Sequence, residues 1–228
     1  MSTHSDRVAD FQLEEWRVEP RLMRMWRGQV AVTLRPRVME ALTVFAGRPG
    51  EIVSKRDLVD EVWSSGFVAD NTIVHCINEL RDALGDDPTM PRFLQTIPRR
   101  GYRMLARPGE IEDDDWIGTL ETARFQLVGT RWAAFLLDGE NLVGRGGDSR
   151  ILLPSERVSR HHARVRVDGN QVVVEDLASK NGTVIGDTRI ERPTQLRDGD
   201  TIVFADLPLV LRRRTPGGVS RTVSMEPD

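Results

Sequence analysis

The first half of the chain mixes short apolar runs with apolar stripes at helical spacing. Residues 12–34 have the pattern of short strands around a turn at Gly28-Gln29. Three segments then repeat apolar residues at helical spacing: from Pro36 to Gly47, after an N-cap at Ser54, and from about Asn71 to Leu84 before a stop at Gly85. The runs FLQTI and YRML, joined by PRRG, predict a hairpin. We therefore expect an α+β unit with three helices and a closing hairpin.

From about residue 120 the pattern changes to short runs of β-branched and other apolar residues. Examples are RFQLVG, AAFLL, HARVRV, QVVVEDL and DTIVF. Between them lie turn dipeptides such as Asp138-Gly139, Asp168-Gly169 and Asp198-Gly199. Many short strands at close spacing predict an all-β sandwich.

An acidic segment separates these two patterns. It follows Pro108-Gly109 and contains Glu110, Glu112, Asp113, Asp114, Asp115 and Glu121 without a single basic residue. Like charges repel, and Pro-Gly interrupts regular structure, so this segment predicts a domain boundary. We expect a winged helix-turn-helix at 1–108, an acidic linker at 109–119, a sandwich at 120–214 and a disordered tail at 215–228.

The composition of the 228 residues is that of an ordinary globular protein, with 39% hydrophobic and 29% charged residues. The N-terminus lacks an apolar signal segment, and no run is long enough to span a membrane. The single cysteine, Cys76, lies on the apolar stripe of the third helix, where a core role is expected. These features predict a cytoplasmic protein without a membrane partner, a disulfide or a cysteine-based metal site.

The net charge of −3 argues against nucleic acid, but the distribution of charge matters more than the sum. The hairpin region 92–107 holds five arginines and no acidic residue. A helix-turn-helix followed by such a hairpin presents one helix to the major groove and a basic loop to the flanking backbone. On the third helix, Asn71, Thr72, His75, Asn78 and Asp82 are expected to face outward, with Arg81 near the edge of this face. The residues expected to contact DNA are Asn71, Thr72, His75, Asn78 and Arg81, together with Arg99 and Arg100 at the hairpin tip. An ordinary surface histidine and a solvated turn remain alternatives for His75 and for the two tip arginines.

Three stretches carry a resemblance to a known family: LRPRVMEALTVFAGRPGEIVSKRDLVDEVW, TIVHCINELRDALGDD and FLQTIPRRGYRM. Residues of about 12–107 resemble the DNA-binding domain of OmpR/PhoB-type regulators, especially its ToxR/CadC-like branch. The resemblance implies that the third helix reads double-stranded promoter DNA and that the hairpin, the wing, makes a second contact. Glu79 and Asp82 occupy positions that are usually basic in the family, which reduces the expected attraction of this helix for phosphates.

The second half places polar and basic residues at three strand ends. Arg145 follows Gly144, Ser159 and Arg160 form a second group, and Lys180-Asn181-Gly182 form a third. Loops at one end of a sandwich converge, so these groups can share a site. A guanidinium with neutral donors around it suits a phosphorylated side chain, which offers three acceptor oxygens.

The segments GR (144–145), SRHHA (159–163) and DLASKNGT (176–183) resemble, in order and spacing, the forkhead-associated (FHA) domain. The resemblance implies phosphothreonine contacts from Arg145 and Ser159, flanking donors at Arg160 and Lys180, and a peptide-backbone contact from Asn181. It also implies that His162 supports the loops from beneath and that Gly144 and Gly182 allow the backbone shape that the site needs. Taken singly, Arg145 is an ordinary surface arginine and Asn181-Gly182 an ordinary hairpin turn. His161 and His162 point to opposite faces of a strand without an evident third ligand, so we expect no metal and no cofactor.

The sequence thus favours a bacterial transcription regulator that couples Ser/Thr kinase signalling to promoter DNA. The expected phosphothreonine partner is a kinase, another protein, or this chain itself, at Thr119, Thr122, Thr215 or Thr222. RNA polymerase and a second copy on DNA are further candidate partners. The alternative is a phosphopeptide-binding adaptor whose winged helix no longer binds DNA, motivated by the zero net charge of residues 1–110 and by Glu79 and Asp82. No catalytic motif was found, so we do not expect an enzyme.

Overall fold

The computed structural model of the chain describes residues 9–63, 68–111, 120, 122–153 and 155–215. The chain divides into two compact units, Met1–Glu112 and Asp113–Asp228. Their boundary falls inside the acidic segment. Most of the expected linker, the expected tail from residue 216 onward, and Thr119 and Thr222 lie outside the described residues.

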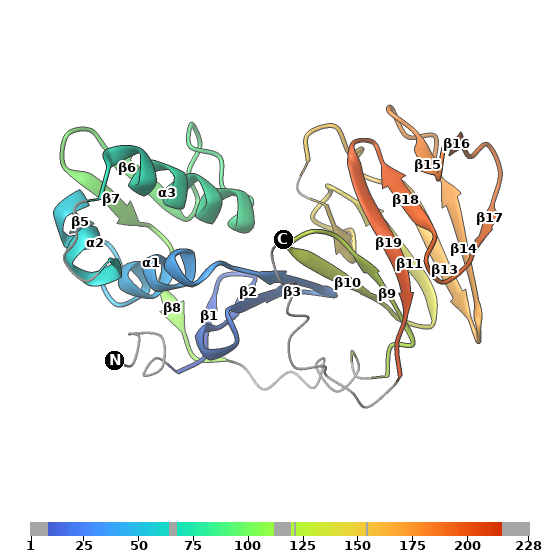
Figure 1. The fold of residues 1–228 in the computed structure, drawn as a ribbon, viewed down its shortest axis with the longest axis horizontal. Helices are drawn as coiled ribbons and strands as arrows, with labels where there is room; N and C mark the ends of the chain where they lie inside the picture. Colours follow the sequence, from blue (N-terminus) through green and yellow to red (C-terminus); the bar gives the residue numbers. More distant parts are fainter. Residues whose placement is uncertain (1–8, 64–67, 112–119, 121, 154, 216–228) are drawn as a thin grey trace. The chain divides into compact units, whose positions relative to one another are not determined.

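The N-terminal unit begins with an antiparallel meander of β1 (Phe11–Leu13), β2 (Trp16–Glu19), β3 (Arg24–Arg27) and β4 (Val30–Thr33), shown in Figure 1. The 3-10 helix η2 (Pro20–Leu22) separates β2 from β3. Where the sequence predicted the start of the linker, Pro108 and Gly109 instead form β8 (Pro108–Gly109), which pairs with β1. A proline is tolerated at the edge of a sheet because its missing N–H is not needed for a further neighbour.

The helices are α1 (Pro36–Ala46), α2 (Lys55–Val62) and α3 (Asp70–Leu84). Their ends follow the signals in the sequence. Pro36 occupies the first turn of α1, and Ser54 caps α2 in a reciprocal capping box with Asp57. Gly85 ends α3 in the left-handed conformation at φ 67°. The three predicted helices are therefore confirmed.

A small sheet with the order β5-β7-β6 completes this unit, built from β5 (Ile52–Val53), β6 (Leu94–Ile97) and β7 (Gly101–Met104). The β6–β7 hairpin is the predicted wing. Helices and strands enclose a core that includes Phe45, Leu58, Leu80 and Phe93. Cys76 belongs to this core, and burial raises the pKa of its thiol to about 11, which confirms a packing role.

The C-terminal unit is a sandwich of two sheets. One has the order β12-β11-β13-β14-β17 and consists of β11 (Gly139–Gly144), β12 (Ile151–Leu152), β13 (Ala163–Asp168), β14 (Gln171–Asp176) and β17 (Thr194–Leu196). Within this unit the other has the order β16-β15-β18-β19-β9-β10. Its strands are β9 (Phe125–Val128), β10 (Trp132–Leu136), β15 (Thr183–Ile185), β16 (Thr188–Arg189), β18 (Thr201–Phe204) and β19 (Leu207–Arg213).

Buried and exposed residues alternate along the strands, so one face of each sheet packs into the core. Val143, Val165 and Val174 from one sheet and Leu127, Phe204 and Leu211 from the other are buried. The expected sandwich is confirmed. In the described part of the chain, no helix has the length and apolar character needed to cross a membrane.

Candidate functional site

Three loops of the sandwich lie at the same end because of the strand register. Val143 at the end of β11 pairs with Ala163 at the start of β13, and Ala163 pairs with Asp176 at the end of β14. The end of β11, the start of β13 and the end of β14 therefore lie side by side in one row at the same edge of the sheet. The loops 145–150, 153–162 and 177–182 follow or precede this row, and they carry the site residues predicted in this unit except Gly144, which ends β11.

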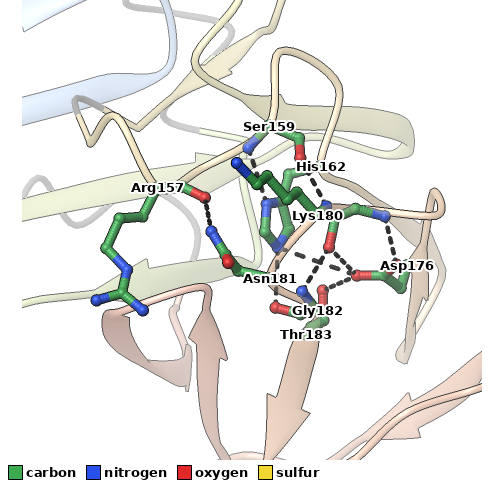
Figure 2. A network of polar contacts seen from close by, with 9 residues as sticks. Arg157, Ser159, His162, Asp176, Lys180, Asn181, Gly182 and Thr183 are labelled. Atoms are coloured by element: carbon green, nitrogen blue, oxygen red, sulfur yellow. Dashed lines mark hydrogen bonds and ion pairs between the residues drawn. The ribbon is translucent and has the colours of Figure 1, made fainter.

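Hydrogen bonds tie the three loops together. The Arg145 backbone N–H donates to the Ser159 carbonyl oxygen at 3.0 Å. The Lys180 backbone N–H donates to Ser159 Oγ at 3.0 Å, and Asn181 Nδ2 donates to the Arg157 carbonyl oxygen at 2.6 Å, as Figure 2 shows. Ser159 Oγ accepts from Lys180, and a hydroxyl group that accepts one hydrogen bond can still donate its own hydrogen to another acceptor. The side chains of Arg145, Arg160 and Lys180 are exposed at this end.

His162 joins two of these loops from beneath. It is fully buried, its Nδ1 lies 3.1 Å from the Ser159 N–H, and its Nε2 lies 3.1 Å from the Gly182 carbonyl oxygen (Figure 2). A backbone N–H can only donate, so Nδ1 accepts and the ring proton resides on Nε2. Burial lowers the pKa of His162 and keeps this neutral form, although the Gly182 carbonyl and the Asp176 charge act in the opposite direction.

Asp176 holds the third loop in shape. Its carboxylate accepts hydrogen bonds from the Ser179 N–H and hydroxyl and from the Thr183 hydroxyl, at 2.7 to 2.8 Å. Burial alone would raise the pKa of Asp176, but these bonds outweigh burial and hold it below the usual value. The Ser179 hydroxyl also accepts from the Gly182 N–H at 2.9 Å. The loop before Asn181 is thus fixed by its own polar side chains.

Gly144 and Gly182, the two glycines expected to shape the loops, lie at positions where another residue would not fit without strain. A Cβ atom on Gly144 would collide with the Arg160 carbonyl oxygen, because two loops meet there. Gly182 adopts φ +83°, a left-handed conformation that other residues reach only with strain. Substituting either residue would displace the loops that carry Arg145 or Asn181.

In the N-terminal unit, α3 presents a row of polar side chains to solvent. Asn71, His75, Asn78 and Asp82, which we call the outward strip, are all exposed, and so is Thr72 in the first turn. The wing tip exposes Arg99 and Arg100, and Arg99 takes the left-handed conformation at φ 63°. Six of the seven predicted DNA-facing residues are therefore accessible: Asn71, Thr72, His75, Asn78, Arg99 and Arg100.

Comparison with known proteins supports the family resemblance of both halves of the chain. Residues 28–104 match the family model described as transcriptional regulatory protein, C terminal, and residues 141–205 match the FHA domain. The chain thus joins an OmpR/PhoB-type winged-helix domain to an FHA domain. Neither matched model is that of a catalytic domain.

Two curated relatives each match part of the chain. Transcriptional activator CadC of Escherichia coli (strain K12) is 36% identical over 92 residues, which are 40% of this chain and 18% of CadC. FHA domain-containing protein FhaA of Mycobacterium tuberculosis (strain ATCC 25618 / H37Rv) is 38% identical over 77 residues, which are 34% of this chain and 14% of FhaA. The chain thus covers less than a fifth of either relative. The solved DNA-binding domain of E. coli CadC is 30% identical, with 46% of this chain and 98% of that chain covered at a TM-score of 0.42.

In the winged-helix domain, the structure corrects one predicted DNA contact. Arg81 is buried, with 7% of its surface exposed. Its Nη2 donates to the Leu94 carbonyl oxygen at 3.0 Å and to Thr96 Oγ1 at 2.8 Å, both on β6 of the wing. The sequence prediction failed because helical spacing places Arg81 at the edge of the outward strip, where the wing covers it. Arg81 therefore connects α3 to the wing.

The structure also changes the role of Glu79, which the sequence placed among the charges that repel DNA. Only 6% of its side chain is exposed, and Arg35 from the start of α1 pairs with its carboxylate. The acidic charge of Glu79 is thus covered and neutralised, whereas Asp82 remains exposed on the outward strip.

In the FHA domain, sequence reasoning missed the residues that support the loops. These are Asp176, Ser179 and Thr183, together with the Arg157 carbonyl that accepts from Asn181. The Asp-x-x-Ser spacing within DLASKNGT was a usable signal, because an aspartate in a turn commonly accepts from backbone and hydroxyl groups a few residues later. The Arg157 contact had no local signal, since it joins residues 24 positions apart.

Proposed function

We propose that this protein is a bacterial transcription regulator that binds promoter DNA through its winged-helix domain and a phosphothreonine-containing protein through its FHA domain. In this way it couples Ser/Thr kinase signalling to transcription. Because bacterial promoters lie in the cytoplasm, we assign the proposed activity to that compartment. The convergence of Arg145, Ser159 and Asn181 at one end of the sandwich is the observation that carries the proposal.

Each of these residues supplies a different part of phosphothreonine recognition. The exposed Arg145 guanidinium pairs with the phosphate dianion, and the Ser159 hydroxyl donates to a second phosphate oxygen. Arg160 and Lys180 add positive charge at the rim of the site. Asn181, held at the Arg157 carbonyl, is the residue that we propose binds the peptide backbone.

The DNA-binding half of the proposal rests on the accessible face of α3 and on the wing. The amide and imidazole groups of the outward strip can form hydrogen bonds with base edges in the major groove. Arg99 and Arg100 at the wing tip suit the negative potential of a neighbouring minor groove or backbone. The covered charge of Glu79 weakens the case for an adaptor without DNA binding, for which the exposed Asp82 and the zero net charge of residues 1–110 remain.

Arg145→Ala tests the phosphate-reading half. We expect affinity for a degenerate phosphothreonine peptide library to fall about 100-fold, or roughly 3 kcal/mol, because the charge-assisted bonds to the phosphate are lost. Arg166→Ala is the matched control, since Arg166 is exposed in the middle of β13, away from the three loops. Isothermal titration with phosphothreonine, phosphoserine and unphosphorylated libraries measures both variants. Equal binding by both variants, or equal binding of unphosphorylated peptide, contradicts the proposal.

A promoter-fragment shift assay, performed with and without Ser/Thr kinase treatment of the protein, tests the link between the domains. We expect binding that weakens steeply with salt, because phosphate neutralisation releases counterions. A change of affinity on kinase treatment supports coupling. The absence of DNA binding in both states supports the adaptor instead.

A further inference from the structure

Arg35 lies beside the outward strip of α3, although it belongs to neither the recognition helix nor the wing. It occupies the N-cap position of α1. Its Nε donates to Glu79 Oε1 at 2.9 Å, and its Nη2 pairs with Glu79 Oε2. The two side chains differ in exposure: 71% of Arg35 is exposed, against 6% of Glu79. The pair therefore has a buried anionic end and an open cationic end.

The position of Glu79 on α3 places this cation on the flank of the outward strip. Residues three and four apart are neighbours on a helix surface. The neighbours of Glu79 at these spacings include His75, four residues before it, and Asp82, three residues after it, both of which are exposed. Arg35 therefore covers Glu79 at the border of the face that we propose enters the major groove.

The pairing geometry leaves Arg35 able to bind a second anion. A guanidinium carries five N–H donors, and the pair with Glu79 engages one edge of it, through Nε and Nη2. An arginine held at one edge by a carboxylate loses side-chain freedom before it meets a phosphate, so less entropy is lost on binding. Other arginines that pair with a strongly buried glutamate are less exposed: Arg37 with Glu40 at 49%, and Arg17 and Arg24 with Glu19 at 21% and 20%.

We propose that Arg35 binds a DNA backbone phosphate next to the bases read by α3, and that Glu79 is a positioning residue that orients it. This inference rests on the proposed binding of DNA. Glu79 was expected to repel DNA. In this proposal it instead holds the Arg35 guanidinium, from the start of α1, at the border of the recognition face. The phosphate attraction missing from this position of α3 is supplied by a residue 44 positions earlier.

The test compares Arg35→Ala in two backgrounds, wild type and Glu79→Gln. In the wild-type background, loss of affinity has two explanations, since removing Arg35 also leaves the Glu79 charge unpaired. The Glu79→Gln background removes that charge but keeps an amide oxygen that accepts from Arg35 Nε, so Arg35 stays in place and a phosphate contact is the remaining source of an effect. Arg24→Ala is the matched control, an arginine paired to a buried glutamate on β3 outside the helix-turn-helix and wing. Affinity of the full chain for a random-sequence DNA duplex is measured by fluorescence anisotropy at several salt concentrations, with circular dichroism to check folding.

We expect Arg35→Ala to weaken binding about fivefold in the Glu79→Gln background and to reduce the slope of log affinity against log salt by about 0.9, the value for one phosphate contact. Arg24→Ala leaves both quantities unchanged. If Glu79→Gln and Arg35→Ala/Glu79→Gln bind DNA with the same affinity and slope, Arg35 only neutralises Glu79 and the inference is wrong. If the wild-type chain binds neither this duplex nor promoter fragments at any salt concentration, the proposed DNA-binding function fails together with it.

Discussion

The FHA loops and the α3 face of the winged helix present their polar residues in different ways. In the FHA domain the motif residues come together: Arg145, Ser159 and Asn181 lie at one end of the sandwich, joined by bonds between loops. On α3 the polar residues divide. Asn78 and His75 stay accessible, whereas Arg81 on one flank and Glu79 on the other are covered.

The difference arises from where each set of side chains sits. The FHA loops follow or precede strand ends that the sheet register aligns, so motif order and strand register largely decide which loops meet. A helix residue at the border of an exposed face can be covered by any element packed beside it. Here β6 covers Arg81 through contacts 13 and 15 residues away in sequence, and the start of α1 covers Glu79 through a contact 44 residues away. Border residues on recognition helices therefore need the tertiary structure for their assignment.

Removing the brace beneath the FHA loops is expected to have the largest effect. His162→Ala creates a cavity, leaves the Ser159 N–H without its acceptor, and removes one of the two donors to the Gly182 carbonyl oxygen, which keeps the Ala205 N–H. We expect the FHA domain to lose about 3 to 5 kcal/mol of unfolding free energy and phosphopeptide binding to disappear. Hydrogen exchange of FHA-domain amides in the full chain measures the stability. His161→Ala, at the exposed neighbouring position, should change it by less than about 0.5 kcal/mol; comparable losses in both variants would show that the brace is not the cause.

Arg81→Met tests whether Arg81 stabilises the winged-helix domain, as its burial indicates, or contacts DNA. The variant keeps much of the side-chain volume but leaves the Leu94 carbonyl and Thr96 hydroxyl without the guanidinium. We expect a loss of about 2 kcal/mol in unfolding free energy, confined to the winged-helix domain. Asn78→Ala on the outward strip is the counterpart: it should weaken DNA binding at unchanged stability. The distinction fails if Arg81→Met leaves stability intact while DNA affinity drops.

The neutral state of His162 predicts a pH dependence of FHA-domain stability. Burial lowers the pKa of His162 in the folded domain, whereas in the unfolded chain this pKa lies near the ordinary histidine value of 6.5. Below this pH the unfolded chain binds a proton that the folded domain does not. Unfolding free energy therefore falls as the pH drops below 6.5, by at most about 1.4 kcal/mol per pH unit, until the folded histidine also titrates.

Amide exchange of the full chain between about pH 7.5 and 5.5 measures this dependence. Its contribution should be absent in His162→Gln and present in His161→Ala. Asp176 does not contribute in this range, because its lowered pKa places its own loss of stability near or below pH 3.8, the ordinary pKa of an aspartate. An identical pH dependence in His162→Gln and wild type would contradict the assignment.

Lys180→Ala gives the smallest expected effect and examines the rim of the FHA site. The Lys180 side chain is exposed, and its structural contact to Ser159 Oγ comes from the backbone N–H, which the substitution keeps. We expect phosphopeptide affinity to fall about twofold to threefold, and the difference to shrink at high salt because exposed charges are screened. Titration at low and high salt checks this. A loss as large as that of Arg145→Ala would place Lys180 at the phosphate itself.

Much of this protein was determined by the sequence alone. Hydrophobic spacing and capping residues such as Ser54 and Gly85 predicted the helices, and turn dipeptides between β-branched runs predicted the sandwich. These are local signals, because caps and turns depend on residues within a few positions of each other. The ordered motifs around Arg145, Ser159 and Asn181 predicted which loops would meet.

The tertiary structure alone decided how residues distant in the chain cover or orient one another. It placed Arg81 under the wing, brought Arg35 onto Glu79 and held Asn181 at the Arg157 carbonyl. It also assigned the proton of His162, through partners three and 20 residues away. The physical reason is the same in each case: a polar side chain's charge and accessibility depend on what packs against it, and helical or strand spacing specifies only the direction in which it points.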